Sequence, residues 1–115
     1  MILYKQFGLS ARDAAEITAD VVEIIQKRLD DEKAVEFLKR KYSGDKLLFA
    51  VLMVGRVTGM TLAIQDFEKA KMILADFSRL IKILNERGKE ELVKTLEREI
   101  LEEAYAEEEL RKGYA

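Results

Sequence analysis

The stretch that most constrains the fold is residues 47–64, because as a helix it would be apolar around its whole circumference. Its large apolar side chains are interrupted only by Gly55, Arg56, Thr58, Gly59 and Thr61. A helix of this kind lies either in a membrane or at the centre of a protein core. Arg56 stands at its midpoint, where insertion into a membrane costs about 3 kcal/mol, and charged residues bracket both ends. We therefore expect a central core helix and no membrane partner.

The sequence before this stretch has the apolar periodicity of two amphipathic helices. In the first helix, apolar residues recur at steps of three and four from Ile17 to Leu29. Beyond Leu29 the apolar stripe is displaced by about 110° around the helical wheel, so one straight helix could not face a single core. We place the break at Asp30-Asp31, either of which can cap a second helix that runs to about Tyr42. Ser10 followed by Asp13 resembles a capping box at the start of the first helix.

The sequence after residue 64 predicts two more helices, about 66–87 and 89–112, separated by Gly88. The former carries a heptad-like apolar seam formed by Phe67, Ala70, Leu74, Phe77, Ile81 and Leu84. No segment has the alternation of a strand. The 115 residues therefore predict a single all-α domain, 1–115: a compact bundle of four to five helices around the helix at 47–64. Residues 1–9 form an apolar N-terminal arm that we expect to lie in a groove.

The residue types that are absent exclude most enzyme chemistry. The chain contains no histidine and no cysteine, which rules out Ser/His/Asp triads, thiolate nucleophiles, imidazole or thiolate zinc sites and disulfides. With 20 Lys and Arg against 22 Asp and Glu, the formal net charge is only −2, which argues against a general polyanion binder. We assign no catalytic residue and expect no cofactor.

Carboxylates are the remaining candidates for chemistry. One face of the first helix carries Asp13, Glu16, Asp20 and Glu23, and the last helix has an E-x-x-E pair, Glu99 and Glu102. This pairing resembles the all-α nucleoside triphosphate pyrophosphatases, in which acidic pairs on facing helices hold Mg²⁺ over a polyphosphate. The resemblance implies metal ligands at Asp20, Glu23, Glu99 and Glu102. Because Asp20 and Glu23 lie opposite the apolar stripe of their helix, we expect them to face water as a solvated acidic face, without a metal site.

A second resemblance is to the helix-turn-helix, carried by residues 9–17 and by Ala15, Ala19 and Ile25 at its small, turn and buried positions. The resemblance implies nucleic-acid binding. Alanine replaces the usual glycine at the turn, and the acidic residues nearby repel phosphate. Binding would also require the basic residues at 27–28 and 39–41 to share one face. We do not expect a nucleic-acid partner.

Two features inside the helix at 47–64 are candidates for contacts. Gly55, Gly59 and Ala63 recur every four residues, which makes a smooth edge that another backbone can approach closely. That edge fits a tight helix crossing within one subunit, a two-fold crossing between subunits, or a ligand groove. Arg56 lies among apolar residues and must bind a carboxylate or carbonyls, reach the rim, or hold an anion.

These observations favour a non-enzymatic interaction or structural module that forms a homodimer, possible partners being a second copy or another protein. The alternatives are a Mg-dependent pyrophosphatase-like enzyme and a nucleic-acid-binding protein. Abundant Lys and Glu with few Asn and Gln are typical of hyperthermophile proteins. In length and composition the chain resembles the short all-helical proteins of unknown function in hyperthermophilic archaea. The N-terminus lacks a signal-peptide pattern, so we expect a cytoplasmic protein.

Overall fold

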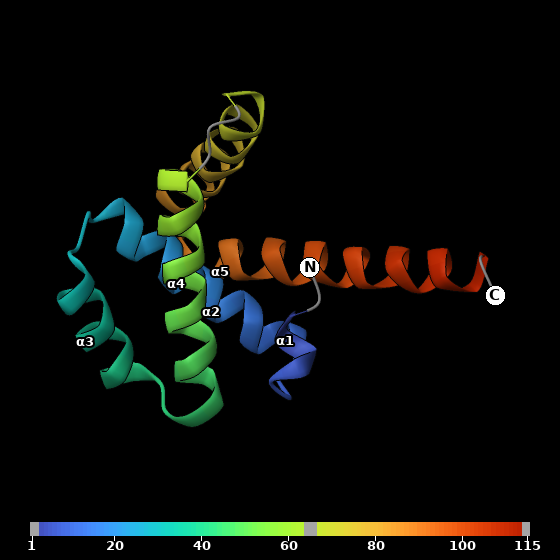
Figure 1. Cartoon of the computed structure of the whole chain (residues 1–115), viewed down its shortest axis with the longest axis horizontal. Helices are drawn as coiled ribbons and strands as arrows, with labels where there is room; N and C mark the ends of the chain where they lie inside the picture. The colour runs from blue at the N-terminus through green and yellow to red at the C-terminus, as the bar shows by residue number, and fades with distance from the viewer. Residues whose placement is uncertain (1–2, 64–66, 114–115) are drawn as a thin grey trace.

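The computed structural model describes residues 3–63 and 67–113, and within those ranges every regular element is a helix (Figure 1). The helices are α1 (Leu3–Gln6), α2 (Ala11–Gln26), α3 (Asp31–Lys41), α4 (Gly44–Ala63) and α5 (Phe67–Gly113). The predicted all-α fold is confirmed. Each predicted helix is present, with α1 added inside the N-terminal arm.

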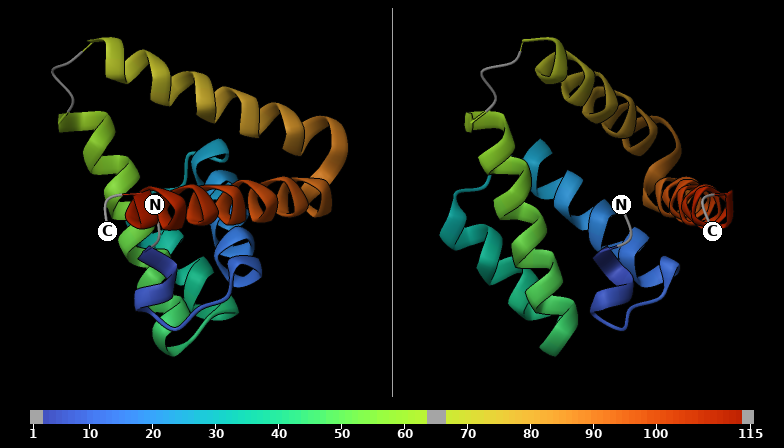
Figure 2. Two further views of the ribbon diagram at one scale, coloured as in Figure 1. Left: turned by 90° about the vertical axis from the view of Figure 1, so that its right-hand side faces the viewer. Right: turned by 45° about the vertical axis from the view of Figure 1, so that its right-hand side comes forward.

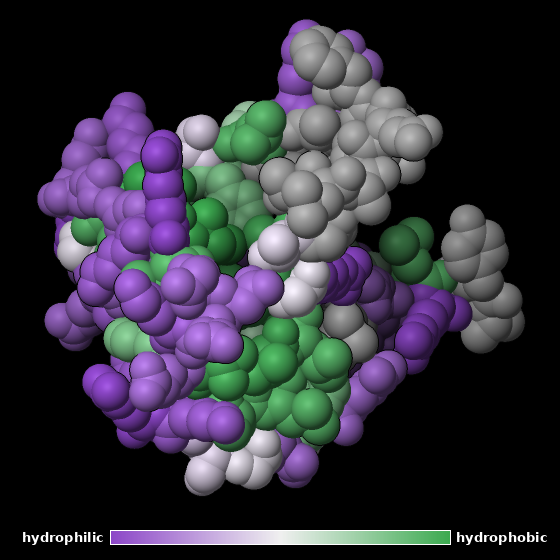
Figure 3. All heavy atoms as spheres, turned by 60° about the vertical axis from the view of Figure 1, so that its left-hand side comes forward, coloured by the Kyte–Doolittle hydropathy of each residue, from purple (hydrophilic) through white to green (hydrophobic). Residues whose placement is uncertain are grey.

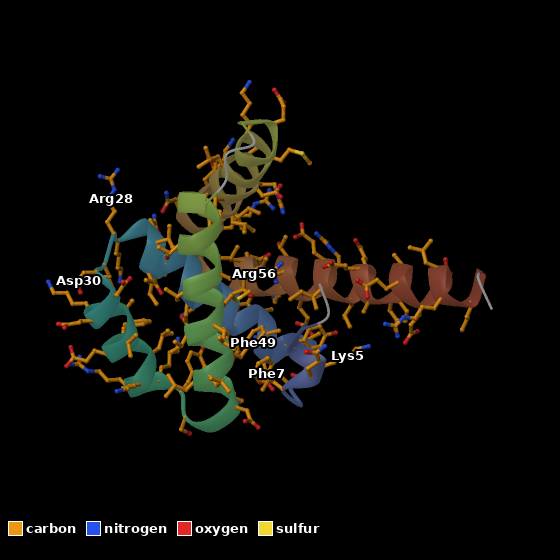
Figure 4. The ribbon with its side chains drawn as sticks, viewed as in Figure 1. Lys5, Phe7, Arg28, Asp30, Phe49 and Arg56 are labelled. Atoms are coloured by element: carbon orange, nitrogen blue, oxygen red, sulfur yellow. The ribbon has the colours of Figure 1, made fainter. Side chains whose placement is uncertain are left out.

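Side-chain caps set the boundaries between α2 and α3. The Ser10 hydroxyl oxygen accepts a hydrogen bond from the backbone N–H of Asp13 at 3.1 Å, and the Asp13 carboxylate accepts one from the backbone N–H of Ser10 at 3.4 Å. At the next junction the Asp30 carboxylate accepts from the backbone N–H of Lys33 at 2.8 Å. Arg28, with a left-handed φ of 54°, turns the chain between the two helices (Figure 4). The predicted break at Asp30-Asp31 is confirmed.

Gly88 divides α5 into a first half, 67–87, and a second half, 89–113. Its backbone has φ 82° and ψ 175°, a conformation open mainly to glycine. The two halves run in different directions, and the C-terminal end of the second half projects beyond the other helices (Figures 1 and 2). The predicted break at Gly88 is therefore confirmed, and it decides where the second half meets the bundle.

The most deeply buried helix is α2, because it is covered on two sides. On one side Ile17 and Val21 belong to the core shared with α3 and α4. On the other, Ala15 and Ala19 pack against the second half of α5, where Leu92 is fully buried. Short alanine side chains let the two helix axes approach closely. Figure 2 shows α2 lying between α4 and this half of α5.

Helix α4 lies against α2 and α3, as expected of a helix in the middle of the bundle. Phe49 and Ala50 are buried there. Other helices do not cover α4 on every side, however, because Leu48 is 51% exposed and Leu52 is 52% exposed. An apolar circumference therefore did not lead to burial on every side within the described part of α4.

The N-terminal arm packs on the core of its own chain. Tyr4 is 5% exposed, and the Phe7 ring meets the Phe49 ring edge-on at 5.6 Å between centroids (Figure 4).

Only part of the heptad-like seam of α5 packs against another helix. Of the seam residues, Leu84 packs beside the Ala15 side of α2, together with Leu80 and Ile83 next to the seam, whereas Leu74 is 59% exposed. The side chains of Phe67 and Ala70 lie outside the described residues.

Replacement of Gly88 with alanine tests the α5 junction. A Cβ there would meet no atom within 4 Å, so the cost comes from the positive φ alone. We expect Gly88→Ala to reduce the free energy of unfolding by about 1–3 kcal/mol, measured by urea denaturation. The matched control is Gly113→Ala, a glycine in open space without a positive φ, which should change stability by less than about 0.5 kcal/mol. Equal effects would contradict the role assigned to Gly88.

Candidate functional site

The most concentrated group of charges in the described chain surrounds Asp20, at the middle of α2. Its side chain is fully buried. One carboxylate oxygen, Oδ1, accepts hydrogen bonds from the ammonium groups of Lys41, at 2.9 Å, and Lys89. The other oxygen, Oδ2, accepts a hydrogen bond from the phenol of Tyr42. We call these four residues the Asp20 cluster.

Three helices supply the Asp20 cluster. Lys41 is the last residue of α3 and Tyr42 is its C-cap, with extended φ and ψ of −129° and 155°. Lys89 follows the Gly88 turn of α5. Glu23, one turn further along α2, lies 3.6 Å from the Lys89 ammonium. The negative charges of two carboxylates and the positive charges of two ammonium groups therefore lie together where α2, α3 and α5 meet.

The expectation that Asp20 faces water is wrong. On the helical wheel Asp20 lies about 60° from Ile17 and about 40° from Ile24, so it is at the edge of the Ile17–Leu29 stripe and not opposite it, and the expectation also assumed only one covered side. In the structure the second half of α5 covers the other side of α2, and α3 ends beside it. The missed signal was a second apolar stripe in the sequence, made by Ala15, Ala19 and Val22 at steps of four and three. The other three acidic residues of that face, Asp13, Glu16 and Glu23, keep partial exposure.

The surroundings of Asp20 determine which of its neighbours carry charge. Burial by itself would raise the pKa of Asp20, but the hydrogen bonds from Lys89, Tyr42 and Lys41 outweigh burial and lower that pKa. Burial and then the hydrogen bond to Asp20 raise the pKa of Tyr42. For Lys89, burial favours the neutral amine, but the contacts with Asp20 dominate and raise its pKa. These shifts favour the carboxylate of Asp20, the ammonium ion of Lys89 and the neutral phenol of Tyr42.

The structure does not bring the four candidate metal ligands together. Both oxygens of Asp20 already accept hydrogen bonds, and Glu99 forms an ion pair with Arg79 at 2.9 Å. Glu102 is exposed on α5. Among the residues that the structure describes, no group of three or more acidic side chains is arranged to hold a metal ion. The arrangement implied by the pyrophosphatase resemblance is not present there.

The basic residues are divided between two places. Lys27 and Arg28 follow α2, whereas residues 39–41 end α3, whose 11 residues span about 16 Å. Lys27 lies 3.7 Å from Glu23, and Lys41 is bound to Asp20. Arg56 is exposed on α4 (Figure 4), so it reaches the rim of the apolar helix. The two groups of basic residues therefore lie at opposite ends of α3.

An apolar groove of about 390 Å³ lies between α3 and α4. Its lining residues are Asp31, Ala34, Val35, Leu38, Val51, Val54, Gly55 and Thr58. Figure 3 shows hydrophobic side chains gathered over the N-terminal half of α4, beside the hydrophilic surface of α3. A Cβ built at Gly55 would meet nothing within 4 Å, so no helix in the described part of the chain crosses closely at this glycine. Gly59 and Ala63 lie outside the residues whose side-chain surroundings are described.

Removal of one hydroxyl group tests the Asp20 cluster. Tyr42→Phe deletes the donor to a buried carboxylate, and we expect it to reduce the free energy of unfolding by about 1.5–3 kcal/mol. Tyr105→Phe is the matched control, because Tyr105 is 66% exposed; it should change stability by less than about 0.5 kcal/mol. Urea denaturation of both variants measures the difference. If Tyr42→Phe leaves the free energy of unfolding unchanged, the phenol does not contribute to stability.

The lowered pKa of Asp20 predicts a loss of stability in acid. The unfolded chain, with an Asp pKa near 3.9, binds the proton more readily than the folded chain does. The stabilisation is therefore fully present above about pH 4–5 and is lost as the pH falls through the lower folded pKa. We expect Asp20→Asn to flatten the dependence of the melting temperature on pH below about pH 4, whereas Asp76→Asn, at an exposed carboxylate, leaves it as in the wild type. Parallel profiles for Asp20→Asn and the wild type would contradict this assignment.

Comparison with known proteins adds no relative. No protein-family model, curated protein or solved structure matches the chain. The described helices include none that has both the length and the apolar character needed to cross a membrane. The features that bear on function are therefore the Asp20 cluster, the groove and the exposed apolar side chains.

Proposed function

We propose that this chain is a non-enzymatic, homodimeric interaction module of the cytoplasm. The observation that carries the proposal is the amount of large apolar surface left uncovered. The exposed side chains are Leu48, Leu52, Met72, Leu74, Leu101, Tyr105 and Leu110, each between 39% and 70% exposed. Leu48 and Leu52 lie one turn apart on the same face of α4, and burial of such side chains between subunits gains about 25 cal/mol per Å² of apolar surface.

The character of the other sites supports an interaction role over an enzymatic one. The charged groups of the Asp20 cluster and of Glu23 bind one another. These contacts hold three helices together. The groove between α3 and α4 is lined mainly by aliphatic side chains, with Asp31 and Thr58 as its polar members. Ligand sites that orient a substrate need several convergent polar groups. An apolar groove with so few of them suits the packing of another apolar surface.

No specific observation favours either of the two alternative functions. A pyrophosphatase-like enzyme would need Asp20 and Glu99 to be available, and each is paired with a cation. A nucleic-acid-binding protein would need the basic residues on one face, and they are divided between two helix ends. A homodimeric module requires only the exposed apolar surface.

The mass in solution tests the proposal. Light scattering at micromolar protein concentration should give twice the chain mass of 13.2 kDa. The value should persist when the salt concentration is raised, because an apolar contact is not screened as surface charge pairs are. A mass of 13.2 kDa across the micromolar range would refute the homodimer.

A further inference from the structure

One face of α4 is left open, and it combines large, small and charged residues. Asp45, Leu48, Leu52, Gly55 and Arg56 fall within about 100° of one another around the helix. All five are exposed, whereas the neighbouring Phe49 and Ala50 point into the core. We call these five exposed residues the open face of α4.

No close approach by the described part of the chain accounts for Gly55 on this face. A glycine inside a helix is about 1 kcal/mol less favourable than alanine. A close contact within the chain would explain this choice, but among the described residues no atom from beyond the glycine's own stretch of helix comes within 4 Å of a Cβ built at Gly55. A neighbour outside the chain that approaches the helix closely would explain it instead.

We infer that the open face of α4 is the contact between two copies of this chain, with the two α4 helices crossing antiparallel near Leu52. The inference rests on the proposed homodimer and adds its contact surface. In this arrangement Leu52 meets Leu52 of the second copy at the two-fold axis. Leu48 then lies over Gly55 of the second copy, so that a large side chain fills the space above a small one.

The charges at the two ends of the open face favour the antiparallel direction. Asp45 lies in the first turn of α4, and Arg56 lies 11 positions later. Antiparallel crossing brings Asp45 of one copy toward Arg56 of the other, whereas parallel crossing would bring like charges together. The unlike ends of the two helix dipoles also meet in the antiparallel arrangement.

The groove between α3 and α4 extends the same surface. Gly55 belongs both to the open face and to the lining of the groove. Val51 and Val54, also on α4, line the groove as well. Figure 3 shows hydrophobic surface over this part of α4, with a hollow beside α3. An aliphatic side chain that crosses Gly55 from a second copy can enter this hollow.

A second copy fits this face better than an unrelated partner does, because the face is complementary to itself. It has a leucine-bearing half with an acidic end, and a glycine-bearing half with a basic end. A two-fold axis pairs each half with the unlike half of the other copy. An isologous contact requires this property, and a contact with a different protein does not.

Cysteine cross-linking tests the crossing point, since the chain has no cysteine of its own. Leu52→Cys should give a disulfide-linked dimer on mild oxidation, seen on a non-reducing gel. Leu48→Cys is the matched control, because the two leucines are 52% and 51% exposed. In antiparallel crossing at Leu52, the two copies of residue 48 are about 12 Å apart along the helix axis, beyond the roughly 7 Å limit between Cα atoms for a disulfide. Efficient cross-linking of both variants, or of neither, would overturn the proposed crossing.

Charge insertion tests the surface independently. Leu52→Glu should convert the dimer to a monomer by light scattering, and Leu110→Glu should leave it dimeric, since Leu110 is 60% exposed on α5. Circular dichroism checks that both variants keep their helices, and the cysteine variants address the same surface if Leu52→Glu unfolds. If the wild type is dimeric and Leu52→Glu stays dimeric, the inferred contact is wrong while the proposed function stands. If the wild type is monomeric, both are wrong.

Discussion

The fold depends most on the buried carboxylate of Asp20. Removing a carboxylate from water costs several kcal/mol unless hydrogen bonds and opposite charges compensate, and here two ammonium groups and a phenol do so. Those donors come from α3 and α5, so the compensation exists only when both helices are docked on α2. Since a charge needs specific donors and an apolar contact does not, the cluster selects one relative position of the three helices among many that would bury similar apolar area.

The position of α2 follows from having two apolar sides of different size. Its branched side, with Ile17 and Val21, builds the core with α3 and α4. Its alanine side accepts the second half of α5 at close range. With both sides of α2 occupied, the described part of α4 is covered by α2, α3 and the N-terminal arm, and the face that carries Leu48 and Leu52 stays open. The surface available for a partner is thus a consequence of how α2 is shared.

Much of the fold could be predicted from the sequence, because helix boundaries depend on neighbouring residues. The capping box at Ser10 and Asp13, the cap at Asp30 and the break at Gly88 each involve groups within a few residues of one another. The candidate site was less accessible. Asp20 was expected to be exposed to water, whereas it is buried. Its hydrogen-bond donors Lys41 and Lys89 are 21 and 69 residues away along the chain, so the pattern of one helix does not indicate them.

By itself, the sequence determined the all-helical character of the chain, the starts of α2 and α3 and the breaks at residues 30–31 and 88. Backbone hydrogen bonding, capping and apolar periodicity act over one or two turns, so a local reading suffices for them. Only the tertiary structure decided that α2 is the most buried helix, that Asp20 is internal and that one face of α4 stays open. Burial depends on which helices cover a face, and that is settled by the packing of the whole chain.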